Sequence, residues 1–115
     1  TVPVTEAMTA AAMGSGDLPV LATPALIALM ENAAMRCVQA DLPAGITTVG
    51  VRMEVAHTRA SAVGARITAR ATLTAQTGRS YTFFVEAFDE KGEIGSGTHT
   101  RASVDREKFL ARLDG

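Results

Sequence analysis

The 115-residue sequence has one cysteine, no tryptophan, and aromatic residues at only 4% of its positions. A single cysteine excludes a disulfide within the chain and is typical of a reducing compartment, so we expect a cytoplasmic protein. So few aromatic rings provide no surface on which bases could stack, and a net charge of −1 gives no bulk attraction to nucleic acid or to a membrane surface. No apolar run approaches the ~20 residues that span a bilayer, and the N-terminal residues lack the layout of a signal peptide.

Sequence motifs for common cofactors are also absent. There is no glycine-rich phosphate loop, no nucleophile elbow of the form G-x-S-x-G and no Cys/His spacing for zinc. With two histidines and no cluster of acidic residues, we expect neither a metal site nor a cofactor. The length favours one domain over residues 1–115.

The clearest predicted element is a helix over residues 23–40. Thr23 followed by Pro24 is typical of a helix start, and the segment 41–45 ends the pattern. An apolar stripe at helical spacing contains Leu26, Ile27, Met30, Ala33, Ala34, Cys37 and Val38. Because Cys37 lies on this stripe, we interpret it as a small core residue rather than a nucleophile.

After this helix the apolar pattern changes to a period of two residues. Strands are predicted over residues 49–57, 65–75, 80–88 and 93–104, with hairpin loops before the third and fourth. Residues 1–5 could form an edge strand, residues 6–13 a short helix, and Asp105 could cap a last helix. One antiparallel sheet wrapped over one helix is the simplest α+β arrangement. It leaves sheet surface uncovered, which favours a dimer.

Glu31 and His57 are the polar residues that this arrangement does not explain. Glu31 borders the apolar stripe, and no cationic residue lies three or four positions away on the helix. His57 is predicted to share the helix-facing side of its strand with Val51, Met53 and Val55. A lone inward histidine is more often a satisfied core residue, but an inward carboxylate and an inward imidazole are both costly unless they meet.

Thr23 and Gly50 each have a structural and a functional interpretation. Thr23 is either the N-cap of the helix or part of a site. Eight residues separate Thr23 from Glu31, about 12 Å along one continuous helix, so a shared site needs a folded-back loop or a second copy of the chain. Gly50 is either an ordinary strand glycine or a backbone N–H that a substrate oxygen can approach.

The stretches L-A-T-P-A-L-I-A-L-M-E, T-V-G-V-R-M-E-V-A-H and E-I-G-S-G-T-H-T-R, in this order and spacing, resemble the hot-dog-fold acyl-CoA thioesterases. The resemblance is to the fluoroacetyl-CoA thioesterase-like group and extends from about residue 17 to residue 113. Its most specific element is a threonine, a glutamate eight residues later and a histidine twenty-six residues beyond, here Thr23, Glu31 and His57. The resemblance implies that these three are catalytic, that Gly50 lines the thioester site, and that Arg101 lies near the pocket.

The same resemblance implies a homodimer with active sites at the subunit interface and hydrolysis of an acyl-CoA to the free acid and CoA. His57 would act as a base on water or on the Thr23 hydroxyl, and Glu31 would either orient His57 or attack the carbonyl. The alternative is a non-catalytic module of this fold that binds acyl-CoA. Specialised members of the group carry phenylalanine residues in a lid before the threonine, but residues 10–22 contain no aromatic side chain, so fluoroacetate specificity is not expected.

Overall fold

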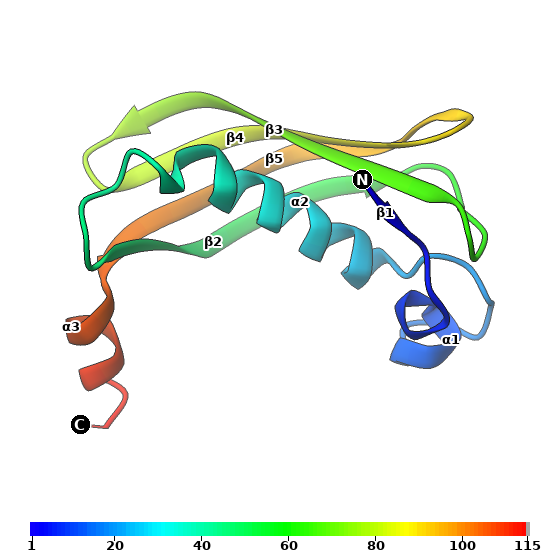
Figure 1. The fold of residues 1–115 in the computed structure, drawn as a ribbon, viewed down its shortest axis with the longest axis horizontal. Coiled ribbons are helices and arrows are strands. Elements are labelled where there is room, and N and C mark those ends of the chain that lie inside the picture. The colour runs from blue at the N-terminus through cyan, green and yellow to red at the C-terminus, as the bar shows by residue number, and fades with distance from the viewer. Residues whose placement is uncertain (115) are drawn as a thin grey trace.

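A single long helix, α2 (Thr23–Gln39), runs along the concave side of a curved five-stranded antiparallel sheet (Figure 1). The computed structural model describes residues 1–114. The strands are β1 (Val2–Pro3), β2 (Ile46–His57), β3 (Arg66–Thr77), β4 (Ser80–Asp89) and β5 (Gly92–Asp105), in the spatial order β1-β3-β4-β5-β2. The predicted α+β hot-dog arrangement of a sheet around one helix is therefore confirmed, and β4, apolar on both faces, is the central strand.

The buried side of α2 is narrower than its apolar stripe predicts. Residues at a spacing of four are buried against the sheet, namely Leu26, Met30, Ala34 and Val38. Cys37 is exposed, so its interpretation as a core residue is wrong. It borders a groove between α2 and β3 together with Leu29 and Ala33. The helix thus presents one edge of its stripe to this groove and only the centre to the core.

Strand β2 changes face partway along its length. Gly50 pairs with Arg101 and Arg52 pairs with Thr100, so Val51 has no partner and forms a β-bulge. Val51 is 58% exposed, and the prediction that it shares a face with Met53 and His57 is wrong. Because one extra residue shifts the alternation, even positions face the helix before the bulge and odd positions face it afterwards.

The glycines of β5 allow the backbones of β5 and β2 to approach closely. A Cβ atom added to Gly97 would lie 2.7 Å from the Cα of Val55. Strand β5 therefore forms a close-packed pair with β2, the edge strand that carries His57.

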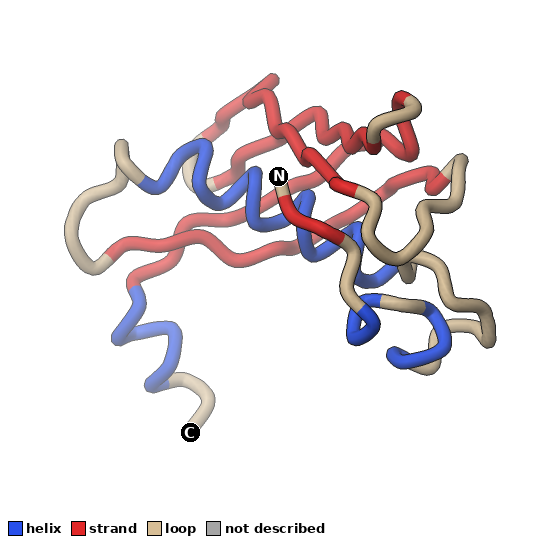
Figure 2. The backbone as a smooth tube through the Cα atoms, turned by 45° about the vertical axis from the view of Figure 1, so that its right-hand side comes forward, coloured by secondary structure: helices blue, strands red, loops and turns tan. Residues whose placement is uncertain are grey.

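The segment that follows β1 and the C-terminal helix extend away from the sheet (Figure 2), whereas β1 itself pairs with β3. The predicted helix over residues 6–13 is divided into a 3₁₀ turn, η1 (Glu6–Met8), and a short helix, α1 (Ala10–Met13), because Thr9 caps α1 with its side chain and pairs with Leu21. At the other end Asp105 caps α3 (Arg106–Ala111), as predicted.

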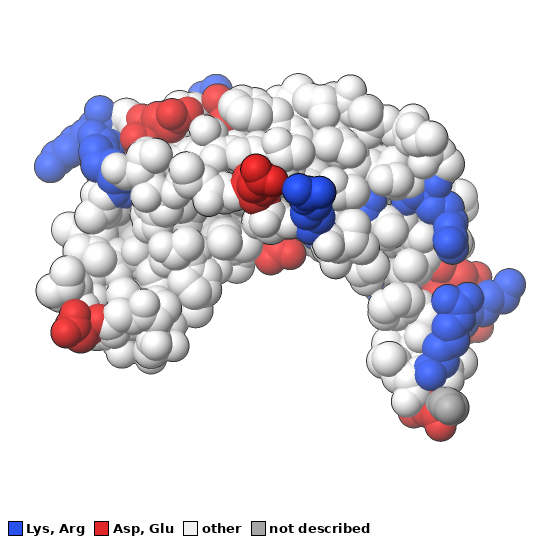
Figure 3. Space-filling view, turned by 180° about the vertical axis from the view of Figure 1, so that it is seen from behind, with Lys and Arg blue, Asp and Glu red and all other residues white. Residues whose placement is uncertain are grey.

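Seen from behind, the molecule is an arch whose charged side chains lie mostly towards its ends (Figure 3). Within residues 1–114, no helix combines the length and the apolar character needed to cross a bilayer.

Candidate functional site

The Thr23 hydroxyl lies 2.8 Å from Nδ1 of His57. Thr23 is the first residue of α2, and Ala22, which has no side-chain oxygen, occupies the N-cap position. The interpretation of Thr23 as the N-cap is therefore wrong, and its hydroxyl is free to bond the imidazole. His57 ends β2, and the Val51 bulge turns it towards the helix. We call this pair the Thr–His half-site.

The Thr–His half-site opens into a cavity of about 250 Å³. One part of the wall consists of small or aliphatic side chains that precede α2, namely Ala10, Ser15, Val20 and Leu21. The other part is the segment that follows β2, namely Thr58, Arg59 and Ala60. The other ring nitrogen of His57, Nε2, is buried and has no hydrogen-bond partner within the described chain. Burial lowers the pKa of His57 below its ordinary value of 6.5, and the backbone of Arg59 opposes this shift only in part.

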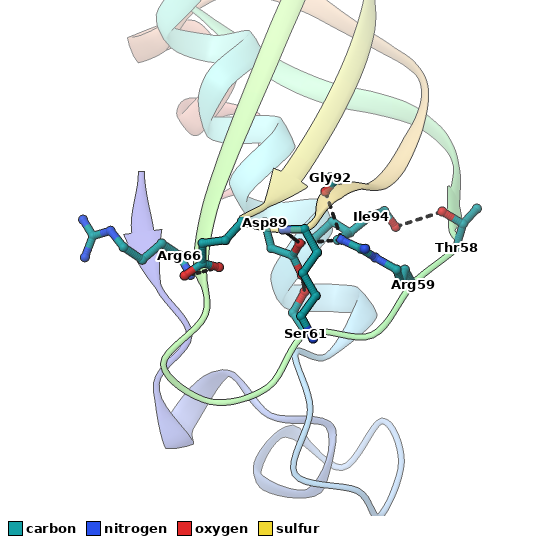
Figure 4. Close-up of polar contacts among 9 residues, drawn as sticks. Thr58, Arg59, Ser61, Arg66, Asp89, Gly92 and Ile94 are labelled. Atoms are coloured by element: carbon teal, nitrogen blue, oxygen red, sulfur yellow. Dashed lines mark hydrogen bonds and ion pairs between the residues drawn. The ribbon is translucent and has the colours of Figure 1, made fainter.

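One wall of the cavity is held by a cluster around Asp89 (Figure 4). The Asp89 carboxylate accepts hydrogen bonds from the Arg59 guanidinium, the Ser61 hydroxyl and the Lys91 amide. Burial opposes ionisation of Asp89, but these bonds and the nearby positive charges together lower its pKa. The cluster ties the segment after β2 to the hairpin between β4 and β5, which fixes Arg59 beside the half-site.

Glu31 lies at a different place, beside Gly50 and Arg101. Its carboxylate Oε2 is 4.0 Å from Nη1 of Arg101, and a Cβ atom added to Gly50 would lie 2.9 Å from the same oxygen. Only a glycine leaves this space open next to the carboxylate. Glu31, Gly50 and Arg101 form what we call the Glu–Arg half-site.

Arg101 is buried and held by neighbouring strands. Its Nε donates to the Thr48 hydroxyl at 2.8 Å, and Nη2 donates to the Thr48 carbonyl at 2.9 Å. Its Nη1 lies 3.2 Å from Nε2 of His99. Burial lowers the pKa of Arg101, and the charge of Glu31 partly restores it, so the two groups stabilise each other.

Within one chain the structure brings together Thr23 with His57, and Glu31 with Gly50 and Arg101. The described contacts of Glu31 do not include His57. The predicted meeting of the carboxylate and the imidazole is thus not made inside one copy of the chain. This agrees with the distance argument along α2, which required either a folded-back loop or a second copy.

His99 and Thr48 are part of this network, and sequence reasoning did not select them. His99 is 1% exposed and Thr48 is 5% exposed. The available signal was the placement of His99 two residues before Arg101, which puts both on one face of a strand. Thr48 gave no such signal, because its contact with Arg101 depends on the register between β2 and β5. Across residues 1–114, no group of three His, Cys, Asp or Glu side chains is placed to hold a metal ion.

Known proteins are similar to this chain in sequence and fold over most of its length. The model of a family described as fluoroacetyl-CoA-specific thioesterase matches residues 4–107. The fluoroacetyl-CoA thioesterase of Streptantibioticus cattleyicolor is 39% identical over 94 residues, which are 82% of this chain and 68% of that protein. A crystal structure of a phenylalanine-to-alanine mutant of a fluoroacetyl-CoA-specific thioesterase, in complex with fluoroacetate and CoA, has a TM-score of 0.92 at 34% identity and covers 98% of this chain and 93% of its own. A Thermus thermophilus protein described as a thioesterase superfamily member has a TM-score of 0.90 at 27% identity, over 98% of this chain and 84% of its own.

Proposed function

Because the chain belongs to the fluoroacetyl-CoA-specific thioesterase family, we propose that it hydrolyses an acyl-CoA thioester to the free acid and CoA. The observation that carries this proposal is the 2.8 Å contact between Thr23 and His57 at the edge of a cavity. A hydroxyl bonded to an imidazole is the arrangement that activates an oxygen nucleophile.

In the proposed reaction, His57 takes a proton from the Thr23 hydroxyl or from a water in the cavity. The resulting oxygen nucleophile attacks the thioester carbonyl, the C–S bond breaks, and CoA leaves as a thiol after protonation of its sulfur. If Thr23 attacks, water then hydrolyses the acyl ester. The backbone N–H of Gly50 and the Arg101 guanidinium would stabilise the carbonyl oxygen as it becomes negative.

The unpartnered Nε2 of His57 needs an acceptor if Nδ1 is to accept the proton of Thr23. We propose that Glu31 of a second copy of the chain supplies this acceptor once the side chains that cover Nε2 in one copy move aside, so that a homodimer completes each site. A carboxylate bonded to Nε2–H fixes the tautomer that leaves Nδ1 unprotonated and stabilises the imidazolium that forms.

Strand β2 is suited to form this dimer. It is a 12-residue strand at one edge of the sheet, and such a long edge is a template for pairing with another strand. On this strand the exposed side chains of Arg52 and Glu54 form an ion pair, with 3.1 Å between Nη2 and Oε2. If two copies of β2 pair antiparallel about a two-fold axis near Met53, Arg52 lies opposite the partner's Glu54 and Gly50 lies opposite the partner's Ala56. The Glu–Arg half-site of one copy then approaches the Thr–His half-site of the other.

The cavity walls favour a range of small or medium acyl groups. Residues 10–22 place only aliphatic and small side chains over the cavity, and we do not extend fluoroacetate specificity to this chain. Release of CoA thiol from a panel that includes acetyl-, fluoroacetyl-, butyryl- and hexanoyl-CoA tests the proposal. Turnover supports it, and tight binding without turnover would favour a non-catalytic binding module.

Mixing variants tests the shared site. If each site is shared between copies, a heterodimer of one His57→Ala chain and one Glu31→Gln chain keeps one intact site and loses the other. Half of the dimers in an equal mixture are such heterodimers, so the mixture should recover about a quarter of the wild-type rate. The matched control mixes Thr23→Val with His57→Ala, which damage the same half-site and should recover nothing. Equal failure of both mixtures, with subunit exchange verified by mass spectrometry, would place each site within one chain.

A further inference from the structure

His99 is a buried titratable residue that the proposed reaction does not use. It is 1% exposed, and its ring stacks beside Phe83 with 6.2 Å between ring centroids. A buried imidazole is costly unless both of its nitrogens are hydrogen-bonded, and here both are. Neither nitrogen points to the cavity beside Thr23.

The contacts of His99 define its tautomer. Nδ1 lies 2.7 Å from the carbonyl oxygen of Arg52, which only accepts, so Nδ1 carries the hydrogen. Nε2 lies 3.2 Å from Nη1 of Arg101, which only donates, so Nε2 is the acceptor. The ring therefore bridges the Arg52 carbonyl, which accepts from Nδ1, and the Arg101 guanidinium, which donates to Nε2.

The first of these groups belongs to the bulge. Arg52 directly follows Val51, the residue that the bulge leaves unpaired. By accepting a hydrogen bond from a buried ring, the Arg52 carbonyl is fixed at the point where the strand changes face. In an unbulged strand Gly50 and His57 would face opposite sides, because successive side chains alternate. The bulge is what permits both to face the helix.

The second group is the Arg101 guanidinium, which is the cation of the Glu–Arg half-site. Thr48 holds two nitrogens of Arg101, and His99 holds the third, Nη1, which is the nitrogen nearest the Glu31 carboxylate at 4.0 Å. A guanidinium fixed at all three nitrogens loses little side-chain freedom when a substrate binds, and its charge keeps one direction.

We infer that His99 is a positioning residue: it fixes the β-bulge through Nδ1 and the Arg101 guanidinium through Nε2, and thereby sets the geometry of both half-sites. Its effect on turnover rests on the proposed function. Its two contacts do not, and they can be measured without substrate.

The tautomer is the first test. Two-dimensional ¹⁵N–¹H NMR of the ¹⁵N-histidine-labelled protein should show a protonated Nδ1 and an unprotonated Nε2 for His99. The signals of the His99 ring are assigned as those that disappear in the His99→Gln variant. A protonated Nε2 would overturn the proposal, because Nε2 could not then accept from Arg101. If the wild-type chain hydrolyses no thioester, the proposed function fails while this result still decides the role of His99.

Two amide variants separate the two contacts. In His99→Asn the amide nitrogen occupies the place of Nδ1 and keeps the bond to Arg52, whereas in His99→Gln the amide oxygen occupies the place of Nε2 and keeps the bond to Arg101. The amides of residues 50–53 should exchange with solvent roughly tenfold faster in His99→Gln than in His99→Asn. Equal exchange would show that His99 does not hold the bulge.

Turnover then distinguishes positioning from simple stability. Both variants should lower kcat by roughly 10–10²-fold with KM changed only a few-fold, because a misplaced group slows the chemical step. Phe83→Leu is the matched control, since it disturbs the packing of the same ring without touching either nitrogen; it should lower the melting temperature and keep kcat within about threefold of wild type. If Phe83→Leu lowers kcat as much as the two amide variants, His99 acts only through core packing.

Discussion

Gly50 and His57 face the same side of β2 although seven positions, an odd number, separate them along the strand. The Val51 bulge accounts for this by adding one residue to β2 opposite β5. The consequence is functional, since one bulge allows a single edge strand to supply parts of both half-sites. Predictions about catalysis can therefore be assigned to one half-site or the other.

Replacing His57 with alanine should lower kcat by roughly 10²–10⁴-fold, because the base that accepts the proton is removed. Thiol release from the best acyl-CoA of the panel measures the effect. Ser15→Ala is a suitable control, since Ser15 lines the same cavity but makes no hydrogen bond with the half-site. Activity of His57→Ala within a few-fold of wild type would show that His57 is not the base.

Thr23→Val and Thr23→Ser distinguish a catalytic hydroxyl from a helix cap. Valine has the shape of threonine without the hydroxyl, so it should lower kcat strongly, whereas serine should retain much of it. Because Ala22 is the N-cap, valine should change the free energy of unfolding by no more than about 0.5 kcal/mol. If the free energy of unfolding measured with urea falls by about 1 kcal/mol or more in Thr23→Val while turnover is unchanged, Thr23 acts as a helix cap and not in catalysis.

The sequence predicts the elements of this fold well, because its periodicities are local. The helix over residues 23–40 and four strands follow from spacing and turn residues alone. Two errors arise from features that depend on neighbouring elements. The period-two pattern of 49–57 contains no sign of the Val51 bulge, and the apolar stripe of α2 does not reveal that Cys37 borders an open groove between α2 and β3 instead of the core.

The membership of the candidate site stays a prediction, and its arrangement was predictable only in part. Thr23 and His57 meet as the family resemblance implies. The place of Glu31 beside Arg101 depends on the register of β2 against β5, which residue types do not encode. Its meeting with His57 stays a prediction about two copies of the chain.

The pH dependence of kcat/KM should report whether Glu31 reaches His57. Burial lowers the pKa of His57 below 6.5, and a base is active only when unprotonated, so activity falls as the pH drops through that pKa. A neighbouring carboxylate stabilises the imidazolium and raises the pKa. In Glu31→Gln the effect of the carboxylate is lost while burial and the Arg59 backbone still act on His57, so the acid limb of the profile should move to lower pH than in wild type. Coincident acid limbs would show that Glu31 does not contact His57.

Gly97→Ala and Gly50→Ala form a matched pair that separates folding from function. The Cβ atom at Gly97 would meet the backbone at Val55, so β2 must move, and we expect unfolding to become easier by roughly 2 kcal/mol or more. At Gly50 the nearest atom is the flexible end of the Glu31 side chain, and the next is Cε1 of His99 at 3.3 Å, which would have to move by only a few tenths of an ångström. Gly50→Ala should therefore keep the melting temperature within a few degrees but lower kcat by displacing the carboxylate. An unchanged melting temperature for Gly97→Ala would contradict the close approach of the two strands.

Asp89→Asn should destabilise the fold by about 1–3 kcal/mol at neutral pH, because the Asp89 side chain is only 5% exposed and its charge satisfies Arg59, Ser61 and Lys91. The pKa of Asp89 in the folded state is below its ordinary value of 3.8. Its contribution to stability is thus complete above pH 3.8 and is lost as the pH falls through the lower folded pKa, where the carboxyl becomes protonated. Urea unfolding of both proteins from pH 7 to pH 2 measures this, and the difference between them should shrink only in the most acidic part of the range. A difference that stays constant with pH would mean that shape rather than charge holds this wall of the cavity.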